Sequence, residues 1–188
     1  MTVPSAEIPL PDFVNWPIFP FVGELQVRAV EPRHNADWAR AGEPGGGPCK
    51  ACQSSDDDYI WVDEHWRVLA PKERSAVPVQ LFLEPRAHVD MDALDPARAA
   101  ELGQLIVRLD RAIQAAGGIG RVHISRWGDG ASHLHLWFYG RPFGDLQMVG
   151  FCLPMWAMIL LPTPEEIWNR NLAIVAQELA KDGGHPIV

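Results

Sequence analysis

The histidine residues of this 188-residue chain offer the first pattern that could support chemistry. His133 and His135 lie in residues 130–142, where Leu and Phe alternate with His, Trp and Tyr. In a β-strand this alternation predicts one apolar face and one face that carries both imidazoles about 7 Å apart. The two histidines could then serve different partners. Such a pair is more often a surface feature than a site, so its meaning depends on the rest of the chain.

The cysteines form a second pattern. Cys49 and Cys52 make a Cys-x-x-Cys motif after a loop rich in Gly and Pro, a spacing typical of zinc sites that need two further ligands. A thioredoxin-like redox pair is the alternative, but that motif opens a helix, whereas Cys52 leads into Gln-Ser-Ser-Asp-Asp-Asp. Cys152 is expected to be a buried structural residue. The spacing leaves the other two ligands open among the histidines His34, His65, His88, His123, His133 and His135.

The elements that must position these residues are predicted to be mainly strands, followed by helices. Runs of β-branched and aromatic residues predict strands at 24–30, 59–62, 66–70, 79–83 and 121–126. The histidine segment is expected to pair with the last of these strands across a turn at 127–130. Residues 148–161 are interpreted as a strand-like piece broken by Pro154.

Two helices carry clear start and stop signals. One begins after Asp95 as N-cap with Pro96 at its first position, and it ends at the glycines 117–118. The other begins with a capping box at Thr163 and ends at the glycines 183–184. Each has one apolar stripe at helical spacing, formed by Leu102, Leu105, Ile106, Leu109 and Ile113, and by Trp168, Leu172, Val175 and Leu179. This order of elements predicts an α+β fold with helices packed on one antiparallel sheet.

Composition limits the domain organisation and the partners. The chain is 47% apolar, enough for the core of one domain, and we expect a Pro-rich arm at 1–48 packed on a domain at 49–188 that ends with a strand and a helix. The net charge of -8 argues against nucleic-acid or anionic-membrane partners. Because the chain has no secretory pattern and no apolar run of about 18 residues, we expect a cytoplasmic protein.

Four motifs together resemble the histidine-triad (HIT-like) superfamily, including its galactose-1-phosphate uridylyltransferase branch. They are the Cys-x-x-Cys pair, Tyr-Ile-Trp-Val-Asp-Glu-His-Trp-Arg-Val-Leu at 59–69, Leu-Glu-Pro-Arg-Ala-His at 83–88 and His-Leu-His-Leu-Trp at 133–137. The resemblance covers about half of the chain. It implies a HIT-like antiparallel sheet with packed helices, and a structural zinc ion held by Cys49, Cys52, His88 and His133.

The same resemblance implies a hydrolase or nucleotidyltransferase in which His135 is the nucleophile. The imidazole would attack the α-phosphorus of a nucleotide and form a nucleotidyl-histidine, which water or a second phosphate resolves. In the family, a backbone carbonyl near the first motif histidine fixes the tautomer of the nucleophile. Expected substrates are dinucleoside polyphosphates, nucleoside phosphoramidates or nucleotide sugars, and a homodimer is possible.

Several residues near the motif are expected to bind the phosphate or the nucleotide. They are the backbone amides of Gly130 and Ala131, the Ser132 hydroxyl, Arg126 and Trp137. Each also has a simpler interpretation: a turn residue for Ser132, a solvated or ion-paired side chain for Arg126, and core packing for Trp137 and Trp127.

Trp137 departs from the family pattern. It stands where hydrolases carry a third His and transferases a Gln. Because Trp accepts no hydrogen bond and donates only through its indole N–H, a contact to the phosphate or the leaving group is lost or altered. The alternative hypothesis is therefore a catalytically weak, zinc-containing nucleotide-binding or regulatory protein.

Overall fold

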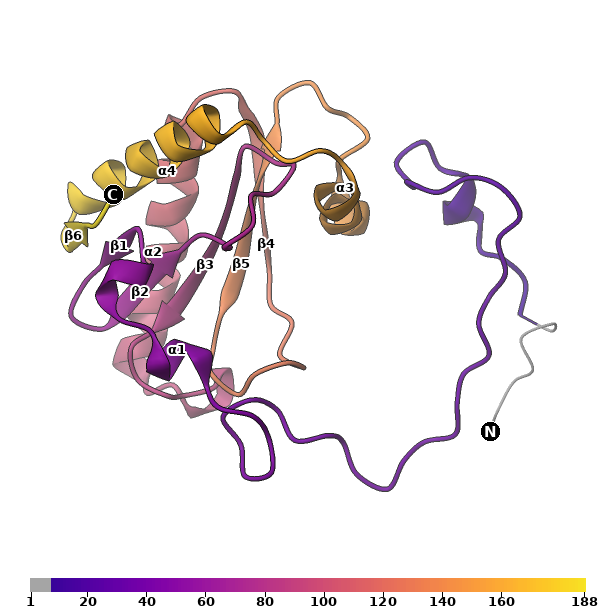
Figure 1. Cartoon of the computed structure of the whole chain (residues 1–188), viewed down its shortest axis with the longest axis horizontal. Helices are drawn as coiled ribbons and strands as arrows, with labels where there is room; N and C mark the ends of the chain where they lie inside the picture. The colour runs from indigo at the N-terminus through magenta and orange to yellow at the C-terminus, as the bar shows by residue number, and fades with distance from the viewer. Residues whose placement is uncertain (1–7) are drawn as a thin grey trace.

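A single six-stranded antiparallel sheet forms the centre of the protein (Figure 1). The computed structural model describes residues 8–188. In the sheet order β4-β5-β3-β2-β1-β6, the strands are β4 (Ile119–Ser125), β5 (Leu136–Pro142), β3 (Val79–Pro85), β2 (Trp66–Leu69), β1 (Trp61–Val62) and β6 (His185–Pro186). The helices are α1 (Lys50–Gln53), α2 (Pro96–Ala115), α3 (Leu153–Ile159) and α4 (Glu165–Ala180). The 3-10 turns are η2 (Asp12–Asn15), η3 (Asp56–Asp58), η4 (Met91–Ala93) and η5 (Gly150–Cys152).

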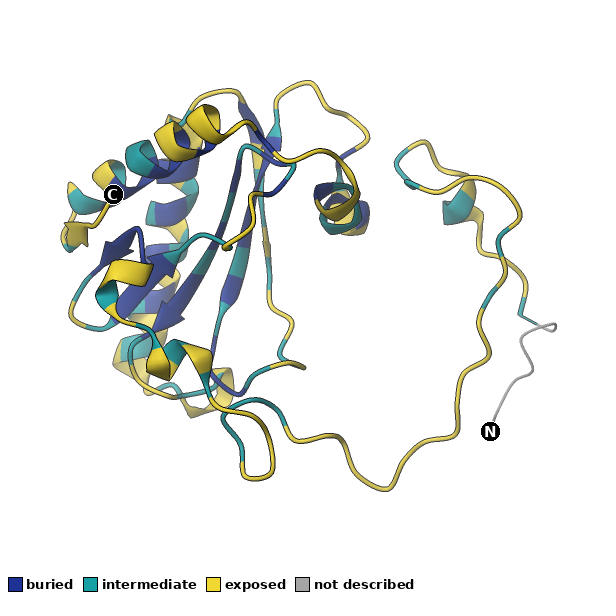
Figure 2. Cartoon of the chain, viewed as in Figure 1, coloured by how far each residue is buried: buried dark blue, intermediate teal, exposed yellow. Residues whose placement is uncertain are grey.

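The main core lies between the sheet and the helices α2 and α4. Both predicted apolar stripes point into it, and β3 contributes Val79, Leu81 and Leu83, all three fully buried. Figure 2 shows the buried residues gathered along this interface. Removing such side chains from water, at about 1.5–3 kcal/mol each, holds the helices on one face of the sheet. The helix α3 lies on the other side of the sheet (Figure 1).

The predicted alternation of the histidine segment is confirmed for its apolar positions. Leu134, Leu136 and Phe138 belong to the main core, whereas Trp137 and Tyr139 pack in a second cluster together with residues of α3. The strand itself begins only at Leu136, so both motif histidines precede it. The backbone of the residues before Leu136 forms hydrogen bonds with Ala41 and Val89 instead of with a neighbouring strand of the sheet.

Two predicted strands are wrong. Residues 24–30 are not a strand, because they are largely exposed and no sheet edge lies beside them. Residues 148–161 contain η5 and α3, because Leu153 and Ala157, four residues apart, are buried together and Pro154 fits the first turn of a helix. The predicted capping box of α4 is also absent: the Thr163 hydroxyl donates to the Val77 carbonyl, and Pro164 is the N-cap.

The arm contacts the domain in two places. Near α3, the Trp156 indole donates to the Ile18 carbonyl at 2.7 Å, and Phe13 packs edge-on against Phe151. Near Cys49, residues 38–43 pair with residues 128–132. The stretch between the two contacts is a wide exposed loop (Figure 2). The first seven residues of the predicted arm lie outside the described residues, and no helix among residues 8–188 is long and apolar enough to cross a membrane.

Candidate functional site

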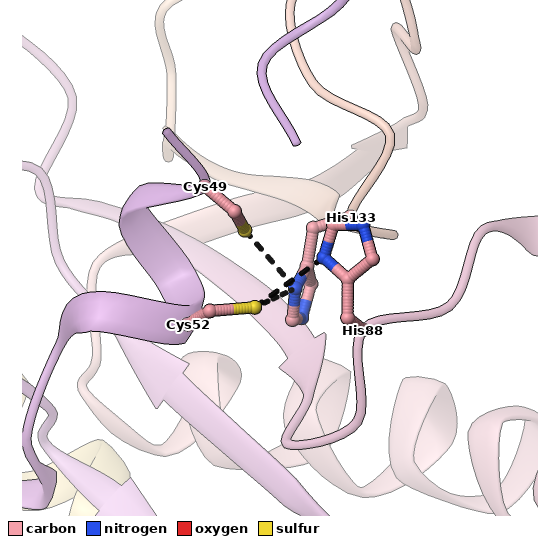
Figure 3. A group of neighbouring side chains, drawn as sticks. All are labelled: Cys49, Cys52, His88 and His133. Carbon is pink, nitrogen blue, oxygen red and sulfur yellow. Dashed lines mark hydrogen bonds between the residues drawn. The ribbon is translucent and has the colours of Figure 1, made fainter. Parts of the chain in front are cut away.

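Four predicted metal ligands converge at one end of the sheet (Figure 3). Cys49 is the N-cap of α1 and Cys52 lies within that helix, whereas His88 follows β3 and His133 precedes β5. The expectation that the Cys-x-x-Cys motif opens no helix is therefore wrong, and the two nearby histidines, rather than the local structure, favour a metal site. One ligand atom from each residue lies within 4.8 Å of the other three. Residues that are far apart in the sequence therefore form one compact set of two sulfur and two nitrogen atoms.

Three sulfur–nitrogen distances within this set match those of a tetrahedral zinc site. The Sγ–Nδ1 distances are 3.5 Å for Cys49 and His133, 3.3 Å for Cys52 and His88, and 3.6 Å for Cys52 and His133. Zinc bonds of about 2.3 Å to sulfur and about 2.0 Å to nitrogen place tetrahedral ligand atoms about 3.5 Å apart. The donor set and its spacing therefore fit zinc.

Hydrogen bonds fix both histidines in the tautomer that a metal requires. His133 Nε2 lies 2.7 Å from the Pro85 carbonyl, which can only accept, so Nε2 carries the proton and Nδ1 the lone pair. The Ser132 hydroxyl donates to the Ala41 carbonyl and therefore accepts from His88 Nε2 at 3.3 Å. Both Nδ1 atoms face the cysteines with free lone pairs.

The ionisation of the ligands shows why a cation suits this site. Burial lowers the pKa of His133 and favours its neutral, metal-binding form. Burial, together with the neighbouring Cys49, raises the pKa of Cys52 to about 11. The Cys52 thiol therefore resists ionisation on its own, and a bound divalent cation would supply the compensating charge.

His135 is held beside this cluster but points elsewhere. Its Nδ1 lies 2.9 Å from the His133 carbonyl, so Nδ1 donates its proton and Nε2 keeps a lone pair. This confirms the hydrogen bond expected for the family nucleophile. The half-buried His135 also lines a cavity of about 340 Å³ together with Lys50, Gly130 and Ala131.

The predicted phosphate-binding residues lie in different surroundings. Gly130 lines the cavity of His135. Ser132 is buried, and its hydroxyl is used between Ala41 and His88. Arg126 pairs with Asp90 at 2.5 Å. The structure therefore brings Gly130 close to His135, while Ser132 contacts His88 of the candidate metal cluster and Arg126 forms an ion pair.

Trp137 lies next to His135 in a row of aromatic rings. Its ring centroid is 6.4 Å from that of His135, 4.4 Å from Phe82, 5.3 Å from Trp127 and 5.9 Å from Tyr139. Its indole nitrogen is buried and has no hydrogen-bond partner among the described residues. Trp127 is 42% exposed, so the row reaches solvent at that end.

Sequence analysis missed residues that shape the site from outside the motifs. Gly42 has φ +93°, and a Cβ there would lie 2.5 Å from the His88 ring. Arg67 donates to the Ala51 carbonyl of α1 at 2.8 Å and pairs with buried Glu84 at 3.3 Å. One sequence signal could have identified Arg67 and Glu84. Each is a charged residue inside a predicted strand that is otherwise mainly apolar, and buried charges of opposite sign are expected to pair.

Comparisons with known proteins support the fold. No protein-family model matches the sequence, and no curated protein matches it. The chain is similar to the structure of a histidine triad protein from Bradyrhizobium japonicum, with a TM-score of 0.53 and 23% identity, over 64% of this chain and 89% of that chain. This similarity confirms the predicted HIT-like fold of an antiparallel sheet with packed helices.

Two further solved structures are similar over comparable lengths. One is a Zn-bound histidine triad family protein from Mycobacterium smegmatis, with a TM-score of 0.47 and 19% identity, over 65% of this chain and 84% of that chain. The other is a uridylyltransferase, with a TM-score of 0.48 and 21% identity, over 69% of this chain and 44% of that chain.

Proposed function

We propose that this protein is a nucleotide hydrolase or nucleotidyltransferase that works through a nucleotidyl-histidine intermediate on His135. The observation that carries the proposal is the hydrogen bond of 2.9 Å between His135 Nδ1 and the His133 carbonyl. It places the proton of the imidazole on Nδ1 and leaves Nε2 to carry the lone pair, which is the tautomer a histidine nucleophile needs. The HIT-like fold is consistent with this role.

The reaction then has two balanced steps. Nε2 of His135 forms a bond to the α-phosphorus, and the bond to the leaving group breaks and leaves its electron pair on that group. The positive charge on the imidazole is stabilised by the His133 carbonyl, which accepts the Nδ1 proton. The oxygen of water or of a second phosphate next forms a bond to the phosphorus, and the bond to Nε2 breaks and returns its electron pair to His135. When water attacks, its proton is released to solvent. We assign the contacts to the phosphoryl oxygens to the amides of Gly130 and Ala131 and to the Lys50 ammonium, because these three residues line the cavity of His135.

Zinc would have a structural role in this scheme. Cys49, Cys52, His88 and His133 would hold it, and when bound it cross-links α1 to the ends of β3 and β5. The free energy of metal binding adds to the free energy of folding. The chain's own residues carry every chemical step, and the substrate would be a nucleoside phosphate derivative.

The test is the intact mass of the protein after rapid quenching with dinucleoside polyphosphates, nucleoside phosphoramidates and nucleotide sugars. We expect a nucleotidyl adduct and released mononucleotide with the wild type, and neither with His135→Asn. His65→Asn is the matched control, because His65 lies in the β1–β2 turn and belongs neither to the lining of the cavity of His135 nor to the Cys2His2 cluster. Equal inactivity of the wild type and His135→Asn, with both folded and zinc bound, would contradict the proposal.

That negative result would favour a second candidate, a catalytically weak nucleotide-binding protein. One observation supports this candidate: the third motif position is Trp137, whose indole nitrogen is buried without a partner. A side chain of this kind cannot exchange protons with a leaving group. Nucleotide binding without turnover would distinguish it from the enzyme.

A further inference from the structure

The two cysteines of the Cys-x-x-Cys motif lie close enough to form a disulfide with each other. Cys49 is the N-cap of α1 and Cys52 is the third residue of that helix, so both belong to one helical turn. Residues three apart on such a turn have Cα atoms about 5 Å apart, which is within the range of about 4.4–6.8 Å that disulfides span. The two Sγ atoms lie within 4.8 Å of each other. A small movement of the side chains would therefore join them.

The three cysteines of the chain differ in their access to solvent. Cys52 is exposed, Cys49 is partly buried, and Cys152 is fully buried at the start of α3. Oxidation selects thiolates that solvent can reach, above all those with a second cysteine nearby. Metal ligation requires both sulfurs of the motif to be deprotonated. Cys52 therefore combines the reactive form with access, Cys49 is placed as its partner, and Cys152 is protected.

The first turn of α1 is also a wall of the cavity that contains His135. Residues 49–51 line this cavity together with His133 and His135. A zinc ion on the four candidate ligands would join this turn to the end of β3 and to the start of β5 (Figure 3). Arg67 holds the same turn through the Ala51 carbonyl at 2.8 Å. Loss of the metal would leave α1 with that weaker attachment.

The histidine ligands have supports that do not depend on the metal. His133 Nε2 donates to the Pro85 carbonyl at 2.7 Å, and His88 Nε2 lies 3.3 Å from the Ser132 hydroxyl. One half of the candidate metal site is therefore fixed by the rest of the fold, whereas the cysteine half sits on a short helix. Such a site can lose its metal at the cysteines and take it up again after their reduction.

We infer that Cys49 and Cys52 are a dithiol that a hydroperoxide oxidises, and that the disulfide releases zinc and frees α1 from the sheet. In the first step the Cys52 sulfur forms a bond to the terminal OH oxygen of the peroxide. The O–O bond breaks, and the other oxygen leaves with the electron pair and takes a proton from solvent. In the second step the Cys49 sulfur forms a bond to the Cys52 sulfur, and the S–O bond breaks with loss of hydroxide, which solvent protonates to water. The two sulfurs lose two electrons and the peroxide gains them.

The test treats the zinc-loaded full chain with hydrogen peroxide and follows zinc release with a colorimetric chelator. Peptide mass analysis after alkylation should show a disulfide between Cys49 and Cys52 that forms as zinc is released, with Cys152 still a free thiol. Hydrogen exchange of the amides of residues 50–54 should become at least about tenfold faster in the oxidised chain, because α1 is no longer joined to the sheet. A dithiol reductant together with zinc should reverse all three changes.

Two variants separate the dithiol from general oxidative damage. Cys52→His keeps four candidate zinc ligands and removes the dithiol, so peroxide should release its zinc at least about tenfold more slowly than that of the wild type. Cys152→Ala is the matched control at the buried cysteine and should release zinc at the wild-type rate. If Cys52→His binds no zinc, the peptide masses and zinc release of the wild type decide the question alone.

The inference is overturned if the wild type keeps its zinc while its cysteines are oxidised, if zinc leaves without a disulfide between Cys49 and Cys52, or if Cys152 reacts as fast as Cys52. None of these readouts depends on turnover or on His135. A wild type that forms no adduct on His135 before oxidation would contradict the proposed function and leave the dithiol standing, so the two failures are distinguishable.

Discussion

Trp137 is the residue expected to decide which leaving groups the protein accepts. Its buried indole nitrogen has no hydrogen-bond partner among residues 8–188 and cannot act as an acid, so a leaving group must depart without a proton from this position. Phosphate and pyrophosphate leave readily as anions, whereas amines do not. We expect kcat/KM for a nucleoside polyphosphate to exceed that for the phosphoramidate of the same nucleoside.

Introducing an acid at this position tests the same argument. Trp137→His should raise kcat/KM for the phosphoramidate by about tenfold or more, because general acid catalysis is worth about 10²–10⁴-fold. The polyphosphate provides the internal control, since its rate should change less. Equal acceleration of both substrates would show that the ring, and not proton donation, limits turnover.

Gly42 is expected to be essential for the metal centre because of its backbone conformation and the lack of a side chain. An Ala there would need φ +93° and would place its Cβ 2.5 Å from the His88 ring. Gly47→Ala is the matched control in the same loop, because nothing lies within 4 Å of a Cβ at that position. We expect Gly42→Ala to lower Tm by roughly 4–8 °C, equivalent to about 2 kcal/mol.

The measurement for this pair is thermal unfolding together with zinc loss to a chelator. Gly42→Ala should release zinc faster than the wild type, because the His88 ring must move, and Gly47→Ala should match the wild type. If the two variants lost zinc to the chelator at the same rate, the close approach of residue 42 to the His88 ring would have no role in holding the metal.

At the scale of elements, Arg67 is expected to hold α1 against the sheet. It donates to the Ala51 carbonyl and pairs with Glu84, and both side chains are less than a tenth exposed. Arg67→Met leaves a buried carboxylate without its cation, which typically costs about 3–5 kcal/mol. Urea unfolding of the zinc-loaded protein measures this loss.

The double variant Arg67→Met, Glu84→Gln removes both charges and should recover much of the stability that the single variant loses. Zinc affinity should recover less, because the donor to the Ala51 carbonyl is still missing. If stability and zinc affinity recover together, Arg67 acts only through its charge.

Elements with local signals were predictable from the sequence, and elements decided by tertiary contacts were not. The side chain of Asp95 accepts from the Arg98 amide, and α2 begins at Pro96 as its capping pattern predicts. Pro154 is compatible with a broken strand or with a first helical turn, and packing of Leu153 and Ala157 selects the helix. Residues 24–30 have strand propensity but no strand edge to join.

The same division applies to the site. The family resemblance was sufficient to select the four candidate ligands and His135, whereas the spacing alone left the two ligands besides Cys49 and Cys52 open among the histidines. The contact between Arg40 and Asp90 spans 50 residues and depends on how a Pro-rich loop turns back on the sheet. No local pattern encodes that path, so the support of the turn at 128–130 was not predictable.

At the scale of the whole molecule, we propose that the functional unit begins near residue 38 and not at residue 49. Residues 38–43 contact the turn at 128–132 and cover His88, while residues 10–22 contact only the region around α3. Two pieces of the chain, 38–188 and 49–188, both contain all four candidate zinc ligands. Both also lack the contacts of the arm with α3, so they differ only in the segment near the site.

We expect piece 38–188 to keep zinc and to bind pyrophosphate, a probe of the proposed phosphate contacts, with nearly the affinity of the full chain. Piece 49–188 should bind pyrophosphate at least about tenfold more weakly, because the carbonyls of residues 128–130 lose their donors on the arm and the turn that carries Gly130 is no longer held. It should also release zinc faster, since the Ser132 hydroxyl loses the Ala41 carbonyl that orients it toward His88. Calorimetric titration and chelator kinetics on both pieces measure these effects. Equal behaviour of the two would place the boundary at residue 49 and reduce residues 38–48 to a connecting loop.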